Sequence, residues 1–244
     1  MEMLGKPTEF IGDVVEACWS NAVQLVESAK QVKAQGRNGL AISLSVLALE
    51  EIGKLHIVDG LLFAKPGDER SDLYEKGFRK HTIKLKVLDL FPLMLTYLCT
   101  FDPRYASEQR FRLTLAIVVD QYKRDRIALA PWLGPACDLV ELDRWKQKGF
   151  YVHVDERNHV ARPSEIDEKM AAAVLQLAIR IVDAVNFVMK DNMARYRQRI
   201  KALREKLTED QHAKIKADAL KVIGPLLSIE EGELSTEESG DRIT

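Results

Sequence analysis

The chain has 244 residues, of which 46% are hydrophobic and 30% charged, and its formal net charge is −1. This composition predicts a soluble globular protein with one main domain, and it excludes a strong overall positive field, so nucleic-acid binding would need a local patch. The three cysteines lie far apart without a CxxC pair, which indicates reduced thiols in a cytoplasmic protein. No signal peptide or membrane span is expected, because no sufficiently long apolar run occurs.

The first half of the chain predicts two long helices in an antiparallel hairpin. Apolar residues recur at helical spacing from Glu9 to Ala34, and the glycines at positions 36 and 39 end this helix. Asn38 is expected to cap the next helix, Leu40 to Leu62. That helix carries an apolar stripe expected to face the core, formed by Leu40, Leu44, Leu47, Leu55, Val58 and Leu62.

Glu51 falls on this predicted core stripe and therefore needs a partner, because an unpaired carboxylate is costly to bury. Lys54 lies one helical turn from both Glu50 and Glu51. Two interpretations stand: the charged group is a structural clamp between helices, or it holds a site together. A di-iron site is excluded because His56 follows Glu51 by five residues instead of three, and we expect neither a metal nor another cofactor.

The middle of the chain predicts further helices from Ser71 to Leu98 and from Glu108 to Ala130, with a bend before Pro92. The breakers at positions 131–135 precede a short helix over residues 136–146. Residues 150–154 are aromatic and β-branched and predict the one extended segment. His81 and Lys84 share a helix face, and His81 is either a proton-transfer group or an ordinary polar residue near a helix start.

The last long helix is expected to begin at Ser164, with Asp167 at capping-box distance, and to run past Val188. The basic segment from Arg195 to Lys206 has few apolar anchors, so this helix is expected to project from the bundle or to pack on a partner. We divide the chain into a helical bundle (9–190), a basic helical extension (191–228) and an acidic disordered tail (229–244).

Several motifs resemble one protein family. The segment Asn21-Ala22, the break at Gly36 and the sequence LALEEIGKLHIV at positions 47–58 are similar to the front half of AbiV-type abortive-infection proteins, a branch of the HEPN superfamily. His81 and Lys84 add to the similarity. The resemblance implies an all-α, HEPN-like antiparallel helical bundle and a cytoplasmic antiphage protein. It also implies, more weakly, a ribonuclease.

Active HEPN ribonucleases carry an Arg, four to six further residues and then a His. Here His153 lies in the expected region, but eight residues separate it from Arg144, and only Lys148 and Lys146 stand at the expected spacings of four and six intervening residues. Lysine neutralises phosphate as a point charge but lacks the bidentate fork of arginine. Asp155 follows two residues after His153, so an extended segment would place both on one face. His159 is the competing histidine.

The candidate catalytic residues are therefore His153, Lys148, Arg144, Asp155 and His81. The predicted structural polar core consists of Glu50, Glu51, Lys54, Lys84 and Tyr151. The resemblance implies a homodimer, an RNA substrate and a phage protein as trigger. The missing arginine spacing favours an alternative, a non-catalytic HEPN module that binds a protein partner. A plain structural helical protein is the third interpretation.

Overall fold

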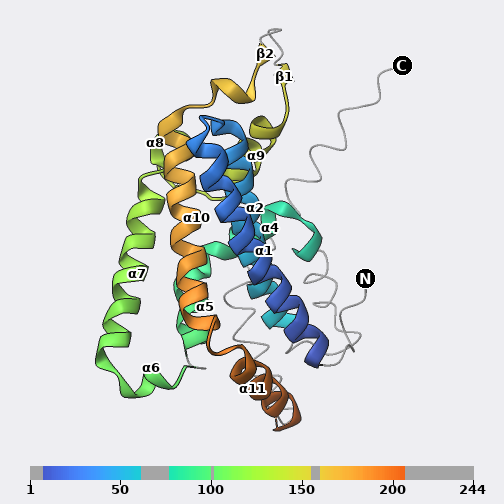
Figure 1. Ribbon diagram of the computed structural model, residues 1–244, viewed down its shortest axis with the longest axis vertical. Helices are drawn as coiled ribbons and strands as arrows, with labels where there is room; N and C mark the ends of the chain where they lie inside the picture. Colours follow the sequence, from blue (N-terminus) through green and yellow to red (C-terminus); the bar gives the residue numbers. More distant parts are fainter. Residues whose placement is uncertain (1–7, 62–76, 100–101, 155–159, 207–244) are drawn as a thin grey trace.

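The computed structural model describes residues 8–61, 77–99, 102–154 and 160–206. It is an elongated bundle of helices (Figure 1), which confirms the predicted all-α fold. The longer helices are α1 (Thr8–Ala34), α2 (Asn38–Leu61), α7 (Gln109–Ile127), α10 (Glu168–Met189) and α11 (Met193–Lys206). The shorter ones are α4 (His81–Lys86), η1 (Val87–Leu90), α5 (Phe91–Cys99), α6 (Pro103–Ser107), α8 (Ala130–Leu133), α9 (Glu141–Phe150) and η2 (Pro163–Glu165).

The first two helices form the predicted antiparallel hairpin, with the turn at Gly36. Helix α1 ends at Ala34, as predicted. Helix α2 begins at Asn38 itself, whose side-chain amide donates a hydrogen bond to the carbonyl of Ile166 at 3.4 Å. Asn38 therefore ties the hairpin to the chain that leads into α10.

Helix α2 lies at the centre of the bundle, packed against α1, α4, η1, α9 and α10. Because helices surround it on several sides, most of its residues are buried, polar ones included. The predicted core stripe is wrong in its first half, since four of its members lie on the least buried side of the helix, although partly covered: Leu40, Leu44, Leu47 and Glu51. The deepest residues instead include Ile42, Val46, Leu49 and Glu50.

The single helix predicted from Ser71 to Leu98 is interrupted, and residues 71–76 lie outside the described residues. Lys80 has an extended backbone (φ −81°, ψ 128°) and starts the short helix α4. A 3₁₀ turn over Val87–Leu90 then leads into α5, close to the predicted bend at Pro92. The break gives α4 its own direction, so its first turn can face α2.

Helix α7 confirms the helix predicted over 108–130 and lies at one side of the bundle against α10 (Figure 1). The helix predicted over 136–146 is shifted, because α9 begins at Glu141 and ends at Phe150. The extended segment predicted over 150–154 is shorter than expected. Only β1 (His153–Val154) forms a strand, paired antiparallel with β2 (Val160–Ala161).

Helix α10 begins after Asp167, whose carboxylate accepts hydrogen bonds from the amides of Lys169 and Met170. Asp167 is therefore the N-cap, and the residue predicted to start the helix, Ser164, lies in the preceding turn η2. Within the described residues α10 is the one helix long and apolar enough to cross a membrane, but 56% of that stretch is buried inside the bundle. Its apolar character is explained by its place in the core.

Helix α11 extends beyond the end of α10 (Figure 1), as predicted for the basic segment, but it also contacts the bundle. Tyr196 is fully buried, and the Arg197 guanidinium lies 2.6 Å from carboxylate oxygens of both Asp13 and Glu16 on α1. The rest of the predicted basic extension after residue 206 and the predicted acidic tail (229–244) lie outside the described residues.

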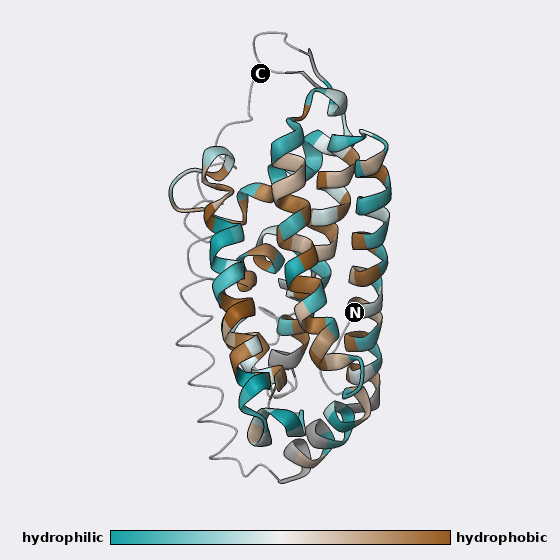
Figure 2. Ribbon diagram, turned by 60° about the vertical axis from the view of Figure 1, so that its left-hand side comes forward, coloured by the Kyte–Doolittle hydropathy of each residue, from teal (hydrophilic) through white to brown (hydrophobic). Residues whose placement is uncertain are grey.

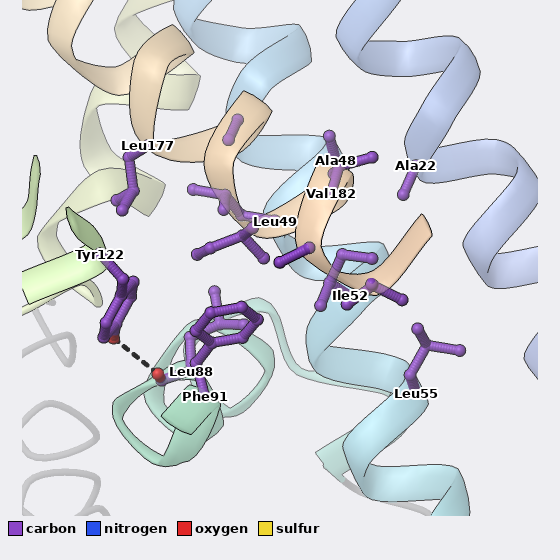
Figure 3. Packing of buried hydrophobic residues seen from close by; sticks show 14 of the residues in the cluster. Ala22, Ala48, Leu49, Ile52, Leu55, Leu88, Phe91, Tyr122, Leu177 and Val182 are labelled. Carbon is purple, nitrogen blue, oxygen red and sulfur yellow. Dashed lines mark hydrogen bonds between the residues drawn. The ribbon is translucent and has the colours of Figure 1, made fainter. Parts of the chain in front are cut away.

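The main core cluster of apolar side chains lies between α1, α2, α5, α7 and α10, and a small second cluster joins Ile57, Ile83 and Val87. Apolar and polar residues alternate along these helices (Figure 2), as expected when one side of each helix packs inward. Tyr122 is fully buried in the main cluster, and its hydroxyl donates a hydrogen bond to the carbonyl of Leu88 at 2.7 Å (Figure 3). This bond ties α7 to the turn that follows α4.

Candidate functional site

Glu50 on α2 is the centre of a polar cluster inside the bundle. Its side chain is 3% exposed. One carboxylate oxygen, Oε1, accepts a hydrogen bond from Nζ of Lys146 at 2.5 Å, and the other, Oε2, lies 2.5 Å from Nδ1 of His81. Nζ of Lys84 lies 3.7 Å from Oε2. We call Glu50, His81, Lys84, Lys146 and Asp143 the Glu50 cluster.

Helix α4 places His81 and Lys84 one turn apart over Glu50, as the shared face predicted. The helix comes so close to α2 that a Cβ atom on Gly53 would overlap the carbonyl oxygen of Lys84. Gly53 belongs to the LALEEIGK segment, so the glycine of that motif is explained by backbone contact between α2 and α4. The consequence is that His81 and Lys84 are held at a fixed position relative to Glu50.

Helix α9 supplies Lys146 through a similarly close contact with α2. The Ser43 hydroxyl donates a hydrogen bond to the carbonyl of Lys146 at 2.8 Å. A Cβ atom on Gly149 would overlap the Gly39 carbonyl and the Ser43 hydroxyl. With its main chain held in this way, Lys146 buries its ammonium group between Glu50 and Asp143, at 2.5 Å from a carboxylate oxygen of each.

Glu51, the predicted centre of the polar inclusion, forms a separate and shallower pair. Its carboxylate lies 2.5 Å from Nζ of Lys54, and their side chains are 13% and 19% exposed. The Lys54 ammonium also lies 5.5 Å from the centre of the Phe78 ring. On the other side Glu51 interacts with the Cys18 thiol, where burial and this carboxylate raise the pKa of Cys18 to about 12. Glu50 is more deeply buried than Glu51, so the stability of its negative charge depends more strongly on the paired ammonium groups.

The electrostatics of the Glu50 cluster follow from its burial. Desolvation lowers the pKa of Lys84 from its ordinary value, although the nearby Glu50 carboxylate opposes this effect. His81 differs from the other members because half of its side chain is exposed. One imidazole nitrogen is thus fixed on a buried carboxylate while part of the ring is accessible to solvent. A histidine held in this manner can exchange a proton with a bound molecule.

Glu50, His81 and Asp143 also place one potential metal ligand each within 4.8 Å of one another. The Lys146 ammonium already lies between the two carboxylates, and Lys84 adds a second amine close by. A divalent cation would have to displace one ammonium group and approach another. The donor set therefore fits an internal ion-pair network better than a metal site.

Arg144 and Lys148, two other predicted catalytic residues, do not join this cluster as the described residues form it. Arg144 is exposed, and the Lys148 ammonium lies 4.6 Å from the centre of the Trp145 ring. Tyr151, predicted to belong to the polar core, is 64% exposed at the end of α9. The backbone of His153 lies in β1 opposite Ala161, whereas Asp155 and the competing His159 lie outside the described residues. The His153–Asp155 pair therefore stays a prediction.

Lys146 was noted in the sequence only for its spacing to His153, and its pairing with Glu50 was not predicted. Its signal is present in the sequence, because Leu142, Lys146 and Gly149 are spaced by four and three residues and all three are buried on one side of α9. When a lysine shares the buried side of a helix with an apolar residue and a glycine, its ammonium group is expected to point into the bundle. The pattern is hard to recognise because α9 has only ten residues and most of its other side chains are charged or polar.

Comparisons with known proteins agree with the motifs. A family model described as AbiV, of the HEPN type, matches residues 10–183, which is more than half of the chain. The match includes α2, α4 and α9, and therefore every member of the Glu50 cluster. Searches of curated proteins and of solved structures found no match. The chain thus belongs to the AbiV family of HEPN proteins.

Proposed function

We propose that this protein is a cytoplasmic antiphage protein of the abortive-infection type, which acts on RNA or on translation through a metal-independent ribonuclease site. The observation that carries this proposal is His81, a half-exposed imidazole with Nδ1 on the buried Glu50 carboxylate. Family membership supports the abortive-infection class, and the geometry supports a proton-transfer group. A homodimer and a phage protein as trigger are the further partners that we propose.

The chemistry follows from the orientation of His81. If Nδ1 donates its hydrogen to Glu50, the other nitrogen, Nε2, has a free lone pair and can accept a proton. It would take the proton of a ribose 2′-hydroxyl, the 2′-oxygen would attack the adjacent phosphorus, and the bond from phosphorus to the 5′-oxygen would break. The products are a 2′,3′-cyclic phosphate and a 5′-hydroxyl, which receives its proton from water. Glu50 stabilises the imidazolium formed in the first step.

Incubation of the purified protein with total bacterial RNA in the presence of EDTA tests the proposal. We expect the wild-type protein to cut RNA and His81→Ala to lose this activity while keeping its helical circular dichroism. His56→Gln is the matched control, because His56 lies on α2 outside the Glu50 cluster. Activity retained in His81→Ala but lost in His153→Ala would transfer the role to His153 and overturn our assignment.

A non-catalytic HEPN module that binds a protein partner is the second candidate. It is favoured by the absence of arginine from the Glu50 cluster as the described residues form it, and by the exposure of Arg144. RNA that stays intact with the wild-type protein, even after addition of extract from phage-infected cells, would overturn the ribonuclease proposal, and capture of a specific partner by the purified protein would then support this candidate.

A further inference from the structure

Helix α7 has apolar side chains on two opposite sides. Its inner side contributes Phe111, Leu115 and Tyr122 to the core. On its outer side Leu113, Ile117 and Ile127 are 54%, 57% and 67% exposed, which makes them three of the most exposed large apolar residues described. A helix that packs only on its own bundle needs one apolar side. The apolar residues on the outer side of α7 therefore indicate contact with another molecule.

The outer residues form a regular stripe together with two charged residues. Leu113, Ile117, Asp120, Arg124 and Ile127 are spaced alternately by four and three residues, which places them within an arc of about 80° on a helix. We call these five residues the outer stripe of α7. Asp120 and Arg124 form an ion pair of 2.5 Å within the stripe, and both remain largely exposed. The spacing is that of a seam between two packed helices.

We propose that the outer stripe of α7 binds the same stripe of a second copy of this chain, with the two helices antiparallel. In one register Ile117 faces the partner's Ile127 and Asp120 faces the partner's Arg124, while Leu113 lies beyond the end of the partner's α7. A parallel pair in register would instead place Asp120 against Asp120. The antiparallel pair obeys the two-fold symmetry that is usual for homodimers.

The inference rests on the homodimer proposed above and assigns its surface, which is separate from the proposed ribonuclease site. None of the Glu50 cluster lies on α7, which packs chiefly against α10 and α6. Substitutions in the outer stripe therefore leave the cluster in place, and RNA cleavage can succeed or fail separately from dimerisation. One pair of helices buries less surface than a permanent dimer needs, so the dimer forms reversibly and depends on concentration.

Sedimentation over a concentration series tests the proposal with the full chain. The wild type is expected to shift from monomer to dimer, and Ile117→Asp to weaken association by about tenfold or more, as for a central apolar contact. Asp120→Arg alone, or Arg124→Asp alone, should weaken the dimer. The double variant Asp120→Arg/Arg124→Asp restores the ion pair within each helix and the ion pairs between the two helices. Glu27→Lys, in an exposed ion pair on α1, is the control and should have no effect.

Cysteine cross-linking tests the register. Ile117 and Ile127 of one chain lie about 15 Å apart along the helix, too far for a disulfide within the chain. The Ile117→Cys/Ile127→Cys variant should therefore form covalent dimers on oxidation, and the three native cysteines give little background because all are buried. A monomer at every concentration, or a dimer unaffected by Ile117→Asp and Ile127→Asp, would overturn the proposal.

Discussion

Replacement of Glu50 by glutamine should reveal how strongly the buried cluster depends on one negative charge. The substitution keeps the size of the side chain but removes the charge that two buried amines, Lys146 and Lys84, and the His81 imidazole approach. Among the described residues, Lys146 would retain Asp143 alone as an ionic partner. The ammonium groups would then stay in a poorly solvated environment without sufficient compensation.

The magnitude follows from the burial of both partners. The side chains of Glu50 and Lys146 are each 3% exposed, and removal of one partner from a buried pair typically costs about 3–5 kcal/mol. Glu51→Gln is the matched comparison one residue further along α2. Its pair with Lys54 is more exposed, so we expect a loss of about 1 kcal/mol. A domain with a free energy of unfolding of about 5–15 kcal/mol tolerates the second change far better.

Urea unfolding followed by circular dichroism measures both losses. A double-mutant cycle with Lys146→Met then isolates the pair, and the double variant Glu50→Gln/Lys146→Met should be more stable than the sum of the single losses predicts. A loss below about 1 kcal/mol for Glu50→Gln, or a larger loss for Glu51→Gln, would refute the claim that Glu50 is the more critical carboxylate.

Three further outcomes are expected. Gly53→Ala should destabilise the protein by about 2 kcal/mol or more in urea unfolding, because the new methyl group overlaps the Lys84 carbonyl. This overlap outweighs the higher helix propensity of alanine. Asp167→Ala should cost about 1 kcal/mol in the same assay by removing the cap of α10. Burial lowers the pKa of His56 to about 4, so the unfolded chain binds its proton first, and stability should fall as the pH drops from about 6.5 to 4 by up to about 1.4 kcal/mol per pH unit. His56→Leu should flatten that part of the stability profile, and an unchanged profile would contradict the assignment.

Helical periodicity located the long helices well, because α1, α7 and α10 each bury one side and leave the other more exposed. It failed for the orientation of α2. That helix is surrounded, so its leucines do not mark a single core side, and Ser43, Ser45 and Glu50 are buried as fully as its aliphatic residues. A central helix needs knowledge of its neighbours before its sides can be ranked.

The candidate site was predictable only where its residues belong to the same helix. His81 and Lys84 lie on one face because both belong to one short helix, a local property that the sequence carries. The contribution of Lys146 depends on α9 lying against α2, which no local pattern specifies. The break at Lys80 was also missed, since Lys80 is not next to a proline and makes no side-chain cap hydrogen bond to α4.

The Glu50–Lys146 pair has a consequence for the order of assembly during synthesis. The two residues are 96 positions apart in the chain. The α1–α2 hairpin leaves the ribosome long before α9 exists, and until then its central carboxylate lacks its ammonium partner. Because contacts between distant segments close late in folding, the cluster is completed only after more than half of the chain has been translated. A truncated product that ends before α9 would contain the hairpin and Glu50 but not Lys146, so its central carboxylate would lack that ammonium partner.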